Sequence, residues 1–283
     1  MFYPADERKC RETAAHYVRD RGIVTDVRDA CGAIVPHAGW ICSGAIAGEA
    51  IAALAKQLPR PDVVVVFGAI HTPLPIDVAA MSSHQRWHEP AGESEVAEEV
   101  TRRLTETGGG LFEIDDRFHE HEHAVEVELP LIQLAWPTAR VLPVEVPLID
   151  DADAIGKRVA KELEASGLSA VFLASSDLTH YGPSYRFTPA GVGMSGLEWA
   201  KENDCRVLSL VTDMQVDRIV PEVQARSNAC GGGAIAAMLA ACRERGAIRG
   251  QVLRHASSFE TLADVAPQRP DNGVGYAGVI VGR

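Results

Sequence analysis

The stretch Val63-Val-Val-Val-Phe67 is the strongest indicator of the fold in this chain. It is continuously apolar and mostly β-branched, a pattern typical of a strand whose two faces are both covered. A strand with one face in water would alternate between polar and apolar residues instead. The stretch therefore predicts a strand inside a largely parallel sheet.

Outward from this strand, apolar runs alternate with segments of helical period. Further strands are predicted at 33–35, 139–146, 170–174, 251–256 and 274–281, and helices at 8–20, 44–57, 93–106, 122–135, 151–165, 194–211 and 230–245. This alternation predicts an α/β fold of three layers, with a mostly parallel central sheet and helices on both faces. No repeat, low-complexity tract or long linker divides the sequence, so we expect a single domain over residues 1–283.

Composition excludes several classes of protein. The 283 residues include 27 Lys and Arg against 39 Asp and Glu, a formal net charge of −12, which disfavours nucleic acid as a partner. No stretch approaches the roughly 20 apolar residues that would span a membrane, and the N-terminal residues lack the pattern of a secretory signal. Six cysteines without a repeating spacing predict reduced thiols, and we expect a cytoplasmic protein.

Three histidines follow apolar runs that are predicted to be strands. They are His37, His71 and His180, and each lies near a glycine. Because the carboxyl ends of parallel strands meet at one edge of a sheet, we expect these side chains to converge. A neutral imidazole binds transition metals and acts as a general base near neutral pH. The alternative is three separate loop histidines, each with its own hydrogen bonds.

The segment His119-Glu-His-Glu-His123 is the densest polar cluster in the chain. If it were extended, its three histidines would share one face, because side chains alternate along an extended chain. If a helix began near Glu122, then His123 and Glu126 would lie in its first turn, where the helix dipole favours glutamate. Pro130 fits such a helix only in the first turn or at a kink. A solvated surface loop is the remaining alternative.

Cys230 differs from the other cysteines because it precedes Gly231-Gly-Gly and a long Ala-rich segment. We expect it to cap a helix N-terminus, where unpaired N–H groups would lower the thiol pKa and favour the thiolate. A thiolate binds metal or attacks an electrophile. The alternative is a small buried thiol packed beside glycines.

Five ordered motifs give the sequence a resemblance to a known family. They are Pro36-His-Ala-Gly-Trp-Ile-Cys-Ser-Gly44, Phe67-Gly-Ala-Ile-His71, Glu122-His-Ala-Val-Glu-Val-Glu-Leu-Pro130, Ser175-Ser-Asp-Leu-Thr-His-Tyr181 and Ala229-Cys-Gly231. In this order they resemble the Memo family, whose bacterial members are called component B of the AmmeMemoRadiSam system. The motifs, together with Asp271-Asn-Gly-Val-Gly-Tyr-Ala near the end, cover residues 35 to 280.

The resemblance implies a fold similar to class III extradiol dioxygenases, which cleave catechol-type rings with non-haem Fe(II). The metal-site positions of the family fall here on His37, His71 and Cys230, and the other polar pocket positions, which we expect to be catalytic, fall on Glu122, His123, Asp177 and His180. Fe(II) is the implied metal, and a cysteine ligand would make copper or zinc better competitors. The implied partners are O₂ and a small molecule such as an aromatic diol.

Three functions are compatible with these residues. In the first, a dioxygenase, His180 is the acid or base and Asp177 orients it. In the second, a non-catalytic protein binds a metal or a peptide partner in a cleft lined by Trp40 and histidines. In the third, a hydrolase or transferase uses Cys230 as the nucleophile and His37 or His180 as the base.

Overall fold

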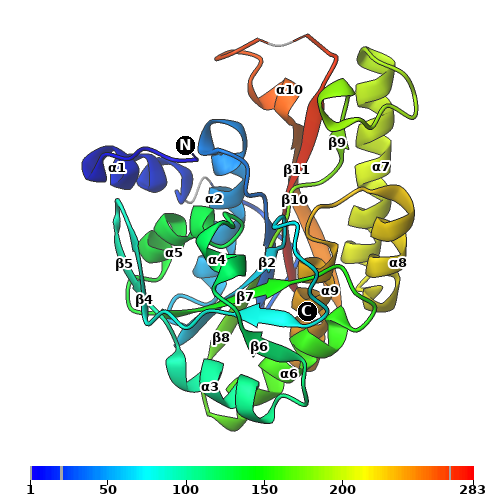
Figure 1. Cartoon of the computed structure of the whole chain (residues 1–283). Helices are drawn as coiled ribbons and strands as arrows, with labels where there is room; N and C mark the ends of the chain where they lie inside the picture. Colours follow the sequence, from blue (N-terminus) through cyan, green and yellow to red (C-terminus); the bar gives the residue numbers. More distant parts are fainter. Residues whose placement is uncertain (1, 20–21, 268) are drawn as a thin grey trace.

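The computed structural model describes residues 2–19, 22–267 and 269–283. In this described part, the chain forms a nine-stranded mixed sheet with helices on both faces, and a separate two-stranded ribbon (Figure 1). The strand order in the large sheet is β10-β11-β1-β8-β2-β7-β3-β6, and β9 pairs with β11. The predicted α/β fold is confirmed.

The centre of the sheet is parallel. Its four strands are β1 (Gly32–Val35), β8 (Ala170–Ser175), β2 (Val63–Ala69) and β7 (Arg140–Val146). Each pairs in parallel with its neighbours among the four, and nearly every residue in them is buried. Their carboxyl ends therefore meet at the same edge, which is where ligand sites of open α/β sheets lie.

Towards its edges the sheet is mixed. On one side β11 (Gly273–Gly282) runs antiparallel to β1, and β10 (Arg249–Ser257) and β9 (His180–Tyr181) run antiparallel to β11. On the other side β3 (Ala79–Met81) is antiparallel to β7, while β6 (Phe112–Ile114) is parallel to β3. Parallel pairing thus holds in the centre and not throughout the sheet.

One face of the sheet packs on three helices, which Figure 1 shows together on one side. These helices are α1 (Glu7–Tyr17), α2 (Trp40–Gln57) and α5 (Leu129–Ala135). Val64 and Val66 of β2 belong to the buried cluster on this face. The neighbouring residues of β2 point to the other face because strand side chains alternate.

The second face carries a larger buried cluster that includes Val63, Val65 and Phe67. The helices that contribute to it are α3 (Glu98–Thr107), α6 (Ala152–Ala165), α7 (Met194–Thr212), α8 (Val216–Arg226) and α9 (Gly232–Glu244). The run at 63–67 is therefore apolar at every position because it contributes to both clusters.

Two predicted helices were wrong in part. The one at 93–106 begins as a strand, because β4 (Arg86–Glu89) and β5 (Gly92–Glu95) form the separate ribbon before α3 starts. The one at 122–135 begins as a loop and a 3₁₀ turn, η1 (Glu126–Glu128), and α5 then carries Pro130 in its first turn, where proline fits.

Other boundaries differ less. The helix predicted at 8–20 ends at Tyr17, and residue 20 lies outside the described residues. Helix α8 was not predicted, and it holds Pro221 in its interior. A short helix, α4 (Arg117–Glu120), precedes the 3₁₀ turn η1, and another, α10 (Ser258–Thr261), lies between β10 and β11.

Candidate metal centre

Three histidines converge at the carboxyl edge of the parallel strands. His37 lies two residues after β1, His71 lies two residues after β2, and His123 comes from the loop before η1. One ring nitrogen from each lies within 4.8 Å of the others. The ring centroids are 5.2 Å apart for His37 and His71, 5.2 Å for His37 and His123, and 4.8 Å for His71 and His123.

The tautomer of His37 follows from its hydrogen bonds. The Ser175 hydroxyl donates to the carbonyl of Ala124 at 2.6 Å. Its oxygen therefore accepts from His37 Nδ1, which lies 2.9 Å away. With the proton on Nδ1, the Nε2 atom of this buried ring keeps its lone pair for a ligand.

Glu122 fixes His71 in the same way. One carboxylate oxygen lies 3.0 Å from His71 Nδ1, and the other accepts from the backbone N–H groups of His71 and Thr72. These bonds lower the pKa of the Glu122 carboxyl, although burial opposes them. An ionised Glu122 accepts a hydrogen bond from the Nδ1–H group, and Nε2 of His71 then carries a lone pair. Carboxylate–imidazole pairs of this kind orient metal ligands.

His123 completes the group and is covered by the N-terminal segment. The ring of Phe2 stacks on it at a centroid distance of 4.5 Å. Burial and the neighbouring His71 lower the pKa of His123 to about 4. Burial also holds the pKa of His37 well below its ordinary value. Both rings are therefore neutral near pH 7, as a metal ligand requires.

These donors fit a transition metal. Imidazole nitrogens suit iron, copper and zinc, whereas a site for magnesium or calcium would offer oxygen atoms. His37 is 1% exposed, while the His71 side chain is 36% exposed, so the group is anchored in the core and open on one side. An open side leaves room for a substrate or a further ligand.

Cys230 lies beside this group. Its sulfur is 3.3 Å from His37 Nε2 and accepts from the backbone N–H of Asp177 at 3.2 Å. It is not among the three donors that lie within 4.8 Å of one another. The residue lies just before Gly231, the N-cap of α9. The pKa of the thiol was predicted to be lowered, but desolvation raises it to about 12, so that prediction was wrong.

His180 opens onto a cavity of about 470 Å³. Cys230, Tyr185, Arg186, Phe187 and Gln224 also line it. The Nδ1 atom of His180 lies 3.0 Å from the carbonyl of Leu178 and donates to it, which leaves Nε2 as an acceptor. Burial lowers the pKa of His180, and so does the nearby His71.

Asp177 does not bond to His180 in the described part of the chain. Its Oδ1 atom accepts from the backbone N–H groups of His37, at 2.9 Å, and Ala38, at 3.3 Å. Burial raises the pKa of its carboxyl to about 7, although these two bonds oppose the shift. The orienting partner of His180 is instead the carbonyl of Leu178, and Asp177 holds the loop that carries His37.

Several residues of the sequence motifs lie elsewhere. His119 belongs to α4, so the segment 119–123 is not extended; its ring bonds to the carbonyl of Ala80, and His121 is exposed. Trp40 was expected to line the cleft, but it is 3% exposed and its indole N–H donates to the carbonyl of Val127. It packs in the core and does not line the cavity of His180.

Two buried acids near the site were missed by the sequence reasoning. Glu128 and Glu145 are 0% exposed, and none of their carboxylate oxygens has a hydrogen-bond partner among the described residues. Burial raises the pKa of both well above the usual carboxyl range, and the charges of Asp177 and Glu122 add to this effect for Glu128 and Glu145 respectively. The sequence does contain a signal for Glu145, because it is the single acidic residue inside the apolar run 141–146 and a buried position was therefore to be expected.

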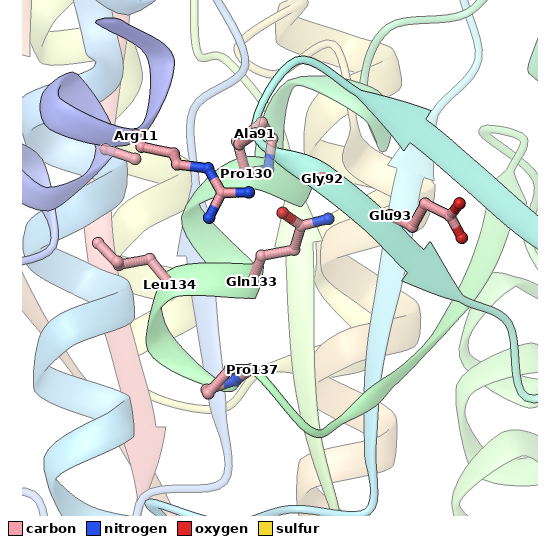
Figure 2. A pocket seen from close by; sticks show the side chains of 9 residues that line it. Arg11, Ala91, Gly92, Glu93, Pro130, Gln133, Leu134 and Pro137 are labelled. Atoms are coloured by element: carbon pink, nitrogen blue, oxygen red, sulfur yellow. The ribbon is translucent and has the colours of Figure 1, made fainter. Parts of the chain in front are cut away.

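Size alone does not identify the site. A hollow of about 450 Å³ lies between α1, α5 and the β4–β5 turn, and Figure 2 shows Arg11 and Gln133 extending into it. None of the clustered histidines lines this hollow. The cavity beside His180 is of similar volume and lies with the residues whose chemistry is distinctive.

Fold and site together define an α/β protein with a three-histidine candidate metal centre at the carboxyl edge of its sheet. The chain belongs to the Memo family, because the family model described as "Memo-like protein" matches residues 1–280. Among the residues that the structure describes, no helix is both long and apolar enough to cross a membrane.

Curated relatives agree with this assignment. A "MEMO1 family protein" of Methanococcoides burtonii is 33% identical over 288 residues, covering 99% of this chain and 96% of the relative. Another, from Pyrococcus furiosus, is 30% identical with the same coverage. Among solved structures, an uncharacterized protein from Escherichia coli K12 has a TM-score of 0.55 and 12% identity, and the match covers 89% of this chain and all of that one. That likeness supports the fold alone.

Proposed function

We propose that this protein is a non-haem Fe(II)-dependent dioxygenase that acts on a catechol-type or related small molecule. The observation that carries the proposal is the group formed by His37, His71 and His123, with His180 beside it on a cavity of about 470 Å³. Iron is the metal implied by the resemblance of the sequence motifs to the Memo family, whose fold is similar to that of the class III extradiol dioxygenases.

The three clustered histidines would hold the metal through Nε2 of His37, Nε2 of His71 and a ring nitrogen of His123. Fe(II) with so few protein ligands offers open positions for O₂ and substrate. Cys230 is the further donor that the family motifs suggest, and its sulfur lies 3.3 Å from His37 Nε2.

The chain's own contribution to the chemistry is proton transfer and orientation. His180 is neutral near pH 7 and presents Nε2 as an acceptor, so it accepts a proton from a substrate hydroxyl in the cavity and later returns it. Tyr185 contacts His180 edge-on at 5.0 Å and restrains the ring. Tyr185 and Phe187 also give the cavity aromatic walls that an aromatic substrate would contact.

Metal content is the first test. Protein purified without oxygen and without a nickel affinity step is analysed for metals, with His71→Gln and His123→Gln beside the wild type. His121→Gln is the matched control, because His121 is exposed and belongs to the same segment as His123. Near-stoichiometric iron that is lost in the first two variants and kept in the control supports the site. Metal content that is equal in all four proteins contradicts it.

Oxygen uptake is the second test. Fe(II)-loaded protein is mixed with catechols, and O₂ consumption and ring-cleavage absorbance are followed. His180→Gln should retain iron and lose at least about 100-fold in rate, the usual contribution of a general base. No O₂ uptake with any catechol, despite bound iron, would overturn the dioxygenase assignment.

A second candidate rests on the 3.3 Å contact between Cys230 and His37, which is the geometry of a cysteine nucleophile and its base. In that case Cys230 should react with iodoacetamide at pH 7 much faster than the exposed Cys205. The raised pKa of the Cys230 thiol favours the opposite order. Peptide mass spectrometry of the alkylated protein decides between the two.

A further inference from the structure

A second cavity, of about 190 Å³, lies between α7, α10 and β11. The clustered histidines, Cys230 and His180 do not line it. Its walls include Thr179, Met194, Leu197, Ala200, Asp204, His255 and Phe259. It is therefore separate from the cavity of His180. The two cavities share no lining residue, although Thr179 lines the one and the next residue, His180, lines the other.

A buried hydrogen bond between Asp204 and His255 forms the polar part of this cavity. Asp204 is 2% exposed, and its Oδ2 lies 2.9 Å from His255 Nε2. Its other oxygen accepts from the backbone N–H of Thr179 at 2.9 Å. Gly275 leaves the space that the carboxylate fills, because a β-carbon there would lie 2.0 Å from Asp204 Oδ2. The carboxylate is therefore held in one position.

This arrangement leaves Nδ1 as the second polar atom of the His255 ring. Its Nε2 faces the Asp204 carboxyl at 2.9 Å, so Nδ1 is the ring nitrogen that remains for a ligand. Among the described residues, Nδ1 has no hydrogen-bond partner and is not sealed from solvent, although the side chain is only 13% exposed. Because Nδ1 is accessible, a hydroxyl on a bound ligand can form a hydrogen bond with it.

The other walls favour a neutral ligand. Met194, Leu197 and Phe259 are apolar, and Lys201 pairs with Glu260 at 2.8 Å, so these two charges offset each other. Glu198 adds a further acid to the wall. Acidic groups without a free cation disfavour an anionic ligand, because transfer of its charge from water would not be compensated.

We propose that this cavity binds a small neutral molecule about the size of one ring, with an apolar body and a hydroxyl that forms a hydrogen bond with His255 Nδ1. Its volume is below that of cavities for drug-sized ligands, which are about 300–1,000 Å³. A ligand bound here contacts Thr179, whose neighbour His180 lines the cavity proposed for the substrate. The two cavities are thus lined by consecutive residues, and this proposal does not depend on the function assigned to the cavity of His180.

The test compares phenol with toluene, which has the same shape and no hydroxyl. Binding is measured by shifts of the Gly273 and Gly275 amide resonances, which report this cavity, during titration of the full chain. We expect phenol to bind roughly fivefold more tightly than toluene, the ratio that one net hydrogen bond gives. Ala200→Leu fills the cavity and should abolish both shifts. His180→Gln, in the other cavity, should leave them unchanged.

A second variant isolates the hydrogen bond. His255→Phe keeps a ring of similar size but removes both ring nitrogens, so it should abolish the preference for phenol without removing toluene binding. Far-UV circular dichroism and thermal unfolding confirm that each variant is folded. The proposal is overturned if neither compound shifts these amides at millimolar concentration, if both bind equally to the wild type, or if binding survives Ala200→Leu in a folded protein.

Discussion

The hydroxyl of Ser175 accepts a hydrogen bond from His37 Nδ1 at 2.9 Å because its own proton is donated to the carbonyl of Ala124 at 2.6 Å. A serine at the end of β8 thereby determines which nitrogen of a histidine after β1 is available to a metal. A residue that hydrogen-bonds to the other ring nitrogen of a metal-binding histidine fixes the tautomer and the orientation of that ring.

Ser175→Ala should weaken metal binding by about 10- to 100-fold, because His37 loses the acceptor that fixes its tautomer. The measurement is a competition titration of the apoprotein with a chromophoric chelator. Ser43→Ala is the matched control, since Ser43 is also buried and donates to a backbone carbonyl, that of Ala38. Both variants should lose about 1 kcal/mol of stability. Equal metal affinity in the two would show that the tautomer of His37 does not matter.

Glu122→Gln should weaken metal binding by about 10- to 100-fold. The new amide can still accept from the backbone N–H groups of His71 and Thr72, so the loop should keep its shape. Its NH₂ group would face His71 Nδ1 and donate to it, which moves the ring proton to Nε2 and blocks the ligand atom. The same chelator titration measures the effect. Glu120→Gln, at an exposed position of the same segment, should bind metal like the wild type.

The central fold was predictable because its signal is local. The run Val63–Phe67 is apolar on both faces, and the parallel strands around it carry the same pattern. By contrast, β3 and β6 have only three residues each, too few to show a period, and Pro221 hides α8, because proline usually ends a helix. Short or interrupted elements are specified by tertiary packing that a sequence pattern does not show.

The site was predictable only where it follows from topology. His37 and His71 come directly after strands, so the common edge of the parallel strands brings them together. The His-rich segment 119–123 drew attention to His123, but no local pattern brings it to the other two, and only the family motifs placed it in the same pocket. The contact between Phe2 and His123 joins the N-terminus to the middle of the chain, and neither residue type predicts the other.

Glu89 should make stability depend on pH. It is 8% exposed, and burial raises the pKa of its carboxyl from 4.5 to about 7. Because the pKa of Glu89 is higher in the folded state than in the unfolded state, the contribution of the protonated carboxyl to the free energy of unfolding is fully present below pH 4.5. This contribution is lost as the pH rises through 7. The shift corresponds to about 3 kcal/mol.

Glu89→Gln cannot ionise, so its stability relative to the wild type should rise by about 3 kcal/mol between pH 4.5 and pH 8. Urea unfolding at a series of pH values measures this difference. The amide oxygen can still accept from Ser94 and Gln133, as the carboxylate does. Glu113→Gln, at an exposed position, should show no such trend. A constant difference between Glu89→Gln and the wild type would contradict the assignment.

Gly68 of β2 and Glu145 of β7 are paired in the sheet, and a β-carbon at position 68 would lie 2.0 Å from Glu145 Oε2. Gly68→Ala should therefore cost at least about 1–3 kcal/mol, the usual cost of overpacking, because the carboxyl is fully buried and has little room to move. Urea unfolding with fluorescence detection measures the loss of unfolding free energy. A Gly68→Ala variant that is insoluble would represent the largest loss expected.

Glu145→Ala should rescue Gly68→Ala, because it removes the group that the new methyl would strike. We expect the double variant to be more stable than Gly68→Ala alone, with an interaction energy of at least about 1 kcal/mol in the double-mutant cycle. Gly68→Ala combined with Glu145→Gln is the matched control, because glutamine keeps the bulk of the side chain and should not rescue. If the costs of the two alanine substitutions simply add, then the clash is not what makes glycine necessary between these strands.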